Sequence, residues 1–139
     1  MAVSLTKIDS FVEKVAEKSF NLGSDQLKIA LTNTAHTSTW SQLSELTEVS
    51  YTNLSGATPL NVTTTSSAQT SGTYKLVLAD LTLTATGAVG PFRYIYLYDD
   101  SATNKELIAY YDYGSSISLA DGDTFTIDFD ASNGVIQIA

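Results

Sequence analysis

The sequence predicts a mostly β protein of a single domain, a β-sandwich or jelly-roll-like barrel that follows an N-terminal amphipathic helix. Three observations favour this class. The chain has 139 residues, which is the length of one ordinary domain. After residue 25 it contains about seven to eight short strand-like runs with turn signals between them. Helical periodicity marks the start of the chain, so we expect a helical segment over 1–22 and a β-sandwich domain over 23–139.

The first 22 residues have the pattern of an amphipathic helix. Apolar side chains recur at helical spacing and charged side chains take the opposite face: Ile8, Phe11, Val12, Val15 and Ala16 against Asp9, Glu13, Lys14, Glu17 and Lys18. Gly23 suits the left-handed conformation that commonly follows a helix. Such a stripe ordinarily packs on the body of its domain, and the alternative is a detachable arm that docks on a partner.

The first part of the β region has one clear strand and then a weakly patterned tract. Apolar side chains alternate over 27–32, which predicts a strand. The tract that follows is rich in Ser, Thr, Asn and Ala, and no charged residue occurs between Glu48 and Lys75. We expect long loops in this tract, with short strands near 49–52 and 60–64.

The second part of the β region has strands that alternate with tight turns. From Tyr74 the alternation changes phase across Asp80, which predicts one long strand with a β-bulge at that residue. Asp121-Gly122 predicts a hairpin turn, and Asn133-Gly134 predicts a tight turn before the C-terminus. The remaining strands are expected over 92–98 and 107–113 and around Phe125, Ile127 and Phe129.

Acidic residues dominate the C-terminal third of the chain. The formal net charge is −8, and a field of this sign repels phosphate backbones, so nucleic acid is not expected as a partner. No apolar stretch approaches the ~20 residues of a membrane-spanning helix, and the absence of cysteine excludes disulfides and zinc–thiolate sites. The acids between 99 and 130, against Lys105 alone, are Asp99, Asp100, Glu106, Asp112, Asp121, Asp123, Asp128 and Asp130.

The titratable residues give little indication of catalysis. His36 is the single histidine and has no carboxylate close in sequence, so we interpret it as an exposed histidine without a role. Two carboxylate pairs with a spacing of two, Asp121 with Asp123 and Asp128 with Asp130, fit a solvated strand face and turns. Calcium binding and glycosidase-type acid pairing are the alternatives for these pairs. We expect no enzyme activity, no catalytic residue, no metal and no cofactor.

Tyrosines are the strongest feature of the sequence. The stretch GPFRYIYLYDD (90–100) places Phe92, Tyr94, Tyr96 and Tyr98 on one face of a strand, and pairing with 107–113 would stack rings across the two strands. The rings suit a sandwich core, a protein interface or stacking on sugars. Arg93, the only arginine, suits a forked pair with a carboxylate or stacking on a ring. The candidate interface consists of Arg93, Tyr94, Tyr96, Tyr98, Tyr110, Tyr111 and Tyr113.

Three stretches carry a resemblance to a known group. NLGSDQLKIALTNT, GPFRYIYLYDD and LIAYYDYGSSISLADGDTFTIDFDASNGVIQIA resemble small acidic proteins encoded among the virion-structural genes of tailed bacteriophages and prophages. The resemblance covers most of the chain except 48–72. The resemblance implies that the protein is a component of the virus particle and not a catalyst. It identifies no catalytic residue in this chain. A compact acidic β domain of this size is similar to capsid decoration, or cement, proteins, which are often trimers at local three-fold positions.

The resemblance implies a non-enzymatic decoration protein that binds the outside of the assembled shell and stabilises it. The major capsid protein would be its partner, a homotrimer its expected state, and the outer capsid surface its location after synthesis in the host cytoplasm. The alternative is a tail-associated or fibre module that binds carbohydrate as an adhesin. An exposed aromatic platform beside carboxylates would favour this alternative.

Overall fold

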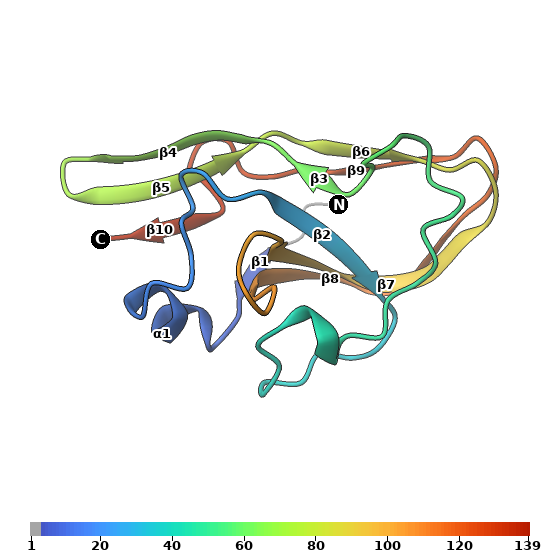
Figure 1. The fold of residues 1–139 in the computed structure, drawn as a ribbon. Coiled ribbons are helices and arrows are strands. Elements are labelled where there is room, and N and C mark those ends of the chain that lie inside the picture. The colour runs from blue at the N-terminus through green and yellow to red at the C-terminus, as the bar shows by residue number, and fades with distance from the viewer. Residues whose placement is uncertain (1–3) are drawn as a thin grey trace.

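The computed structural model describes residues 4–139, and it confirms a mostly β fold with a small helix near the N-terminus (Figure 1). Among these residues all strand pairs are antiparallel. In chain order the elements are β1 (Leu5–Lys7), α1 (Phe11–Ala16), β2 (Leu27–Thr32), the 3-10 helix η1 (Leu43–Glu45), β3 (Asn61–Val62), β4 (Thr64–Thr70), β5 (Thr73–Leu78), β6 (Leu81–Thr84), β7 (Val89–Asp99), β8 (Leu107–Leu119), β9 (Thr124–Ile127) and β10 (Ile136–Ile138).

The strands form two layers, as expected for a sandwich. Within the described residues, one sheet has the order β1-β8-β7-β2-β3, a second β10-β5-β4, and a third pairs β6 with β9. Figure 1 shows β4, β5, β6 and β9 above the layer of β1, β2, β7 and β8. Apolar side chains from both layers are buried between them, for example Ile29, Leu76, Leu83 and Phe92. Burial of these apolar side chains between the layers stabilises the fold.

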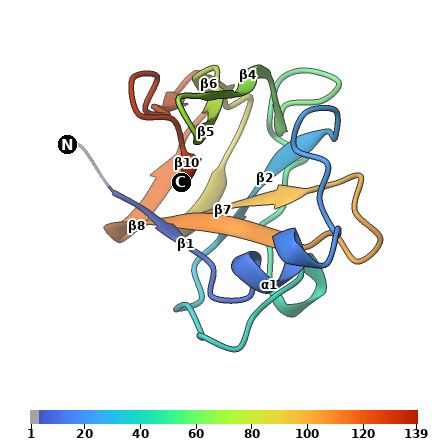
Figure 2. The ribbon, with the colours of Figure 1, turned by 90° about the vertical axis from the view of Figure 1, so that its left-hand side faces the viewer.

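A third group of residues covers the outer side of the five-stranded sheet. Figure 2 shows α1 and the segment after β2 below β7 and β8, on the side away from β4–β6. Burial on both faces explains why the central strands are apolar almost without interruption. In β7 every residue from Tyr94 to Asp99 is buried. The chain itself therefore covers both sides of this strand.

The N-terminal segment differs from the long helix that the sequence predicts. Leu5–Lys7 form β1 and pair with β8, and α1 is only six residues long. The residue with a left-handed φ after the helix is Lys18 (64°), so the role expected for Gly23 is wrong. Ile8 and Phe11 are buried, so the described part of the segment is built into the domain and the docking-arm alternative is not favoured. Residues 1–3 of the expected segment lie outside the described residues.

The chain changes sheet near Asp80 and near Gly122, and the strands around both positions pair differently from the expectation. Asp80 separates β5 from β6, which belong to different sheets, so the strand is broken there and not bulged. Gly122 adopts the left-handed conformation (φ 88°) of a tight turn, yet β8 pairs with β7 and β1 while β9 pairs with β6. The turn therefore carries the chain from one layer to the other and forms no hairpin.

The weakly patterned tract contains fewer regular elements than expected near 49–52. Glu48 forms an isolated bridge with Thr32, but residues 49–52 form no strand. The strand expected near 60–64 is present as β3, and β4 follows after one residue. At the C-terminus Asn133-Gly134 forms the expected turn, where a Cβ on Gly134 would lie 2.6 Å from the Leu76 carbonyl oxygen.

Candidate functional site

The predicted tyrosine ladder is present between β7 and β8. Tyr96 pairs with Tyr110, and their rings stack with centroids 5.3 Å apart. A register shift lies between Phe92 and Tyr94, and the Phe92 side chain points toward the sandwich core. There its ring centroid lies 5.5 Å from that of Phe125. The expectation that Phe92 shares a face with the tyrosines is therefore wrong, because the irregularity reverses the alternation.

The seven candidate interface residues fall into three environments. Tyr94, Tyr96, Tyr98 and Tyr111 are buried within the chain, so the core accounts for these four rings. Tyr110 is half-buried on the outer side of the sheet, and Tyr113 is half-buried on the opposite face, toward β9. With Arg93, only these two tyrosines retain surface that a neighbouring molecule could contact.

Arg93 makes both of the contacts that the sequence suggested. Its Nε lies 2.7 Å from Asp112 Oδ1 and its Nη2 lies 3.1 Å from Oδ2, so the guanidinium binds the carboxylate as a fork. Its central carbon also lies 5.2 Å from the centre of the Tyr94 ring. The hydrogen bonds from Arg93 lower the pKa of Asp112 and raise that of Arg93 itself. Both side chains are exposed, so the pair contributes little to stability.

His36 is not the exposed residue that its sequence context suggested. Its Nδ1 lies 2.8 Å from the Tyr96 hydroxyl, and its ring stacks on Tyr110 with centroids 4.2 Å apart. The Trp40 ring meets it edge-on at 5.9 Å. Burial lowers the pKa of His36, while the charge of Asp9 opposes that shift. These contacts of His36 and Trp40 attach the segment after β2 to the sheet. The alternation of tyrosines in the sequence did not predict them.

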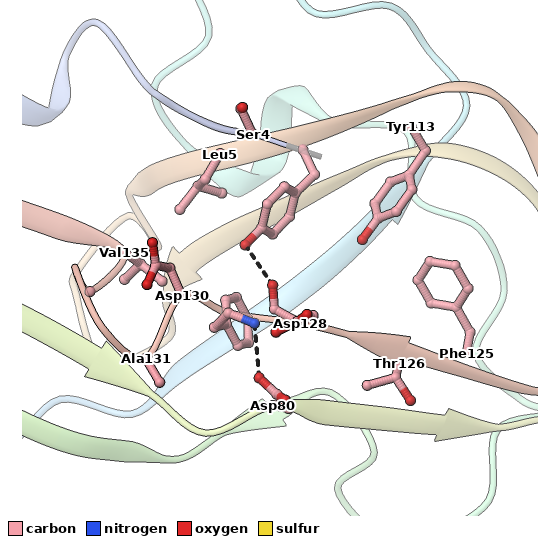
Figure 3. Close-up of a pocket in the computed structure, with 13 residues that line it drawn as sticks. Ser4, Leu5, Asp80, Tyr113, Phe125, Thr126, Asp128, Asp130, Ala131 and Val135 are labelled. Carbon is pink, nitrogen blue, oxygen red and sulfur yellow. Dashed lines mark hydrogen bonds between the residues drawn. The ribbon is translucent and has the colours of Figure 1, made fainter. Parts of the chain in front are cut away.

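A groove lies between β8 and the segment that runs from β9 toward β10 (Figure 3). We call it the tyrosine groove. It measures about 1020 Å³. In Figure 3 the rings of Tyr113 and Phe125 lie at one end and Asp130 with Val135 at the other. The residues that line it include Asp80, Tyr111, Tyr113, Phe125, Asp128, Phe129 and Asp130.

Side-chain contacts connect the walls of the tyrosine groove. The Tyr111 hydroxyl donates to the Asp128 carbonyl oxygen at 3.3 Å, and the Phe129 N–H donates to Asp80 Oδ1 at 2.9 Å. The Tyr113 and Phe125 rings meet nearly perpendicularly at 5.3 Å. Burial raises the pKa of Tyr111 and of Tyr113, so both hydroxyls stay protonated and can donate.

The carboxylates of the groove differ in their hydrogen bonds. Asp128 and Asp130 are exposed, as expected, but they follow the end of β9 and lie outside any strand, so the expected strand face is wrong. Asp130 accepts from the backbone N–H groups of Ser132 and Asn133, which lower its pKa together with the Asn133 amide. Within residues 4–139, no three His, Asp or Glu side chains are arranged to hold a metal ion. The sequence pointed to Asp128 and Asp130, but it gave no signal that Asp80 lies with them.

A buried carboxyl at the end of β7 was also not foreseen. Asp99 is fully buried, and its Oδ1 accepts from the N–H groups of Ser101 and Ala102 at 2.9 and 3.1 Å. Its Oδ2 has no hydrogen-bond donor among the described residues. Burial first, and then the neighbouring Asp25, raise the pKa of Asp99 to about 7. The carboxyl is therefore held near its point of titration at neutral pH.

Comparison with known proteins assigns the chain to no family, because no family model, no curated protein and no solved structure matches it. In the part that the structure describes, no helix is both long and apolar enough to cross a membrane.

Proposed function

We propose that this protein is a non-enzymatic virion structural protein of a tailed bacteriophage, a decoration protein that binds the outside of the assembled capsid shell. The major capsid protein is its proposed partner. The resemblance of three stretches to virion-structural proteins supports the class of function. The observation that carries the proposal is strand β4, an uncharged strand at the edge of a sheet in an otherwise acidic protein.

Strand β4 has the properties of a docking edge. Among the described residues it pairs only with β5, so one side of its backbone is free to form hydrogen bonds. Its sequence, TTSSAQT, has no charge and no proline, the two devices that usually protect such an edge. An extended segment of a partner can add to an edge of this kind as a further strand. The neutral edge also avoids the repulsion that the net charge of −8 would exert on another acidic protein.

Binding through β4 would stabilise a shell without any catalysis. A ligand that binds the assembled state alone shifts the equilibrium toward that state by mass action. Identical sites repeated over a shell add their modest individual effects. A homotrimer at each local three-fold position, as the resemblance implies, would increase this effect through multivalent contact.

The test is co-sedimentation with shells assembled from the major capsid protein of the same virion. Ser66 and Ala68 are exposed on β4, so a Ser66→Lys, Ala68→Lys variant places charge on the edge without disturbing the core. We expect this variant to bind shells at least about tenfold more weakly, a loss of ~1.4 kcal/mol in binding free energy. The control for added positive charge is Thr103→Lys, one lysine at an exposed position in the turn between β7 and β8, compared also with Ser66→Lys alone.

Equal retention of the β4 variant and the control would contradict docking through this edge. Failure of the wild-type protein to sediment with shells would contradict the decoration function itself. Protection of the shell against heat, measured in the same samples, reports the stabilising effect directly.

A second candidate function is a tail-associated or fibre module that binds carbohydrate. The tyrosine groove favours it, because half-buried aromatic rings and carboxylates line the same concave surface. This is the combination that suits sugar rings, which offer both an apolar face and hydroxyl donors.

A further inference from the structure

The apolar end of the tyrosine groove is formed by two rings that the fold holds in place. Tyr113 and Phe125 are half-buried and meet nearly perpendicularly at 5.3 Å. Phe125 also packs edge-on against the fully buried Phe92, so its position is set by the core. Rings fixed in this way offer an apolar surface at little entropic cost on binding.

The polar side of the groove offers hydrogen-bond acceptors. The Asp128 side chain is exposed and makes no hydrogen bond or ion pair with residues 4–139. Asp80 uses Oδ1 for the Phe129 N–H, which leaves its second oxygen available. Asp130 is occupied by its own turn. Charged carboxylates accept strong hydrogen bonds, so two of them can bind neighbouring hydroxyl groups.

The charge of the groove selects against anions. Three carboxylates, Asp80, Asp128 and Asp130, line it, and no basic side chain does so among the described residues. A phosphate, a uronate or a sialic acid would meet repulsion there. A basic peptide would be attracted by the charge, but the Tyr113 and Phe125 rings and the limited number of free carboxylates favour a ligand that is itself half apolar and half hydroxylated.

The groove is also large and preformed. Its volume of about 1020 Å³ lies at the upper end of the range of ~300–1,000 Å³ for small-molecule sites, with room for more than one sugar ring. The bonds Tyr111–Asp128 and Phe129–Asp80 join β8, the end of β9 and the β5–β6 junction around it. Walls connected in this way need little rearrangement when a ligand binds.

We infer that the tyrosine groove binds a neutral oligosaccharide, with one pyranose ring packed on Tyr113 and Phe125 and hydroxyl groups donating to Asp80 and Asp128. The inference rests on the second candidate function and deepens it by giving the site and the ligand class. It is independent of docking through β4, which lies in a different sheet from the strands that line the groove.

Saturation-transfer NMR and titration with a defined panel test the inference. The probes are neutral oligosaccharides of glucose, galactose and N-acetylglucosamine, a sialylated oligosaccharide, and an oligolysine peptide. We expect at least one neutral member to bind with a Kd tighter than about 1 mM. We expect the sialylated probe to bind at least about tenfold more weakly than its neutral counterpart.

Two groove variants and one control locate the binding site. Asp128→Asn is the decisive variant, because the side chain is exposed and outside the core; we expect about tenfold weaker binding. Tyr113→Ala should weaken binding at least as much. Tyr110→Ala is the matched control, since that ring is also half-buried but lies on the opposite face of β8 against His36. Thermal unfolding of each variant verifies that the fold is intact.

Several outcomes would overturn the inference. These are no binding by any neutral probe, equal affinity of wild-type protein and Asp128→Asn, or binding of oligolysine alone. The same variants in the shell assay separate the two proposals. Asp128→Asn should sediment with shells as the wild type does, and the Ser66→Lys, Ala68→Lys variant should retain saccharide binding.

Discussion

Asp99 is a single buried residue whose effect on stability depends on pH. Its folded pKa of about 7 lies above the ordinary carboxyl value of 3.8. At pH values between these two pKa values, the Asp99 carboxyl is deprotonated in the unfolded chain and protonated in the folded chain. The free energy of unfolding therefore falls as pH rises from about 4 to 7. We expect Asp99→Asn to remove this slope and to be more stable than the wild type at pH 8, as measured by urea unfolding over pH 5–8.

Other titrating residues must be separated from Asp99 in that experiment. His36 has a lowered folded pKa, so it acts in the opposite direction and makes stability rise with pH up to about 6.5. A His36→Gln background removes this contribution. Asp100, Asp112 and Asp130 have lowered pKa values, so their contributions are lost only below about pH 4. Identical slopes for Asp99→Asn and wild type in the His36→Gln background would contradict the assignment.

The surroundings of single residues were only partly predictable from the sequence. Alternation located the Tyr96–Tyr110 ladder, because side chains on paired strands alternate by geometry. It failed for Phe92, since a register shift leaves no mark in the residue pattern. It also failed for Asp99, because an Asp-Asp-Ser run has the composition of an exposed turn, while the fold buries the first carboxyl.

At the scale of elements, the N-terminal segment is an integral part of the domain. Phe11 on α1 is buried and its ring lies 5.2 Å from that of Phe20, while the adjacent Val12 is 58% exposed. We expect Phe11→Ala to lower the free energy of unfolding by about 3–5 kcal/mol, the usual cost of removing a buried ring. We expect the neighbouring control Val12→Ala to change it by less than about 0.5 kcal/mol. Chemical denaturation of both variants measures the difference.

A small effect of Phe11→Ala would restore the interpretation of this segment as a detachable docking arm. Limited proteolysis gives a second readout, because an arm that is released from the domain is cleaved before the β strands are. The pairing of β1 with β8 argues for the integrated segment.

Turn chemistry predicted where elements end, but not which strands pair. Glycine at 122 and 134 marks left-handed positions that the structure confirms. A turn fixes the backbone only locally, whereas strand partners are chosen by burial across the whole sandwich. For this reason the Asp121-Gly122 turn leads to the other layer, and Asp80 ends a strand where a bulge was expected.

At the scale of the molecule, the two-layer fold followed from the sequence but the tyrosine groove did not. Its walls come from Ser4 and Leu5, from Asp80, from Tyr111 and Tyr113, and from lining residues between 125 and 135, so they span nearly the whole described chain. Only the topology brings them together. Tyrosines and carboxylates could therefore be named as candidate residues from the sequence, but the concave surface that they line could not be predicted.

The oligomeric state is the property that most directly relates the surface of the molecule to its proposed role. A standard protein interface buries ~800 Å² on each partner and has an apolar core. In the described part of the chain, Val12 and Ile138 are the exposed large apolar residues. Four of the seven candidate interface residues are buried within the chain itself. Little apolar surface remains to hold a trimer together in solution.

We therefore expect the isolated protein to be a monomer of 14.9 kDa by light scattering at micromolar concentration, and the proposed trimer to assemble only on the shell, where neighbouring sites bring the copies together. A stable species of three times that mass, independent of dilution, would contradict this expectation. It would also assign the subunit interface to the candidate residues that retain surface, Arg93, Tyr110 and Tyr113. Alanine at Tyr110 should then dissociate the trimer, since aromatic side chains contribute most of the binding energy of such interfaces.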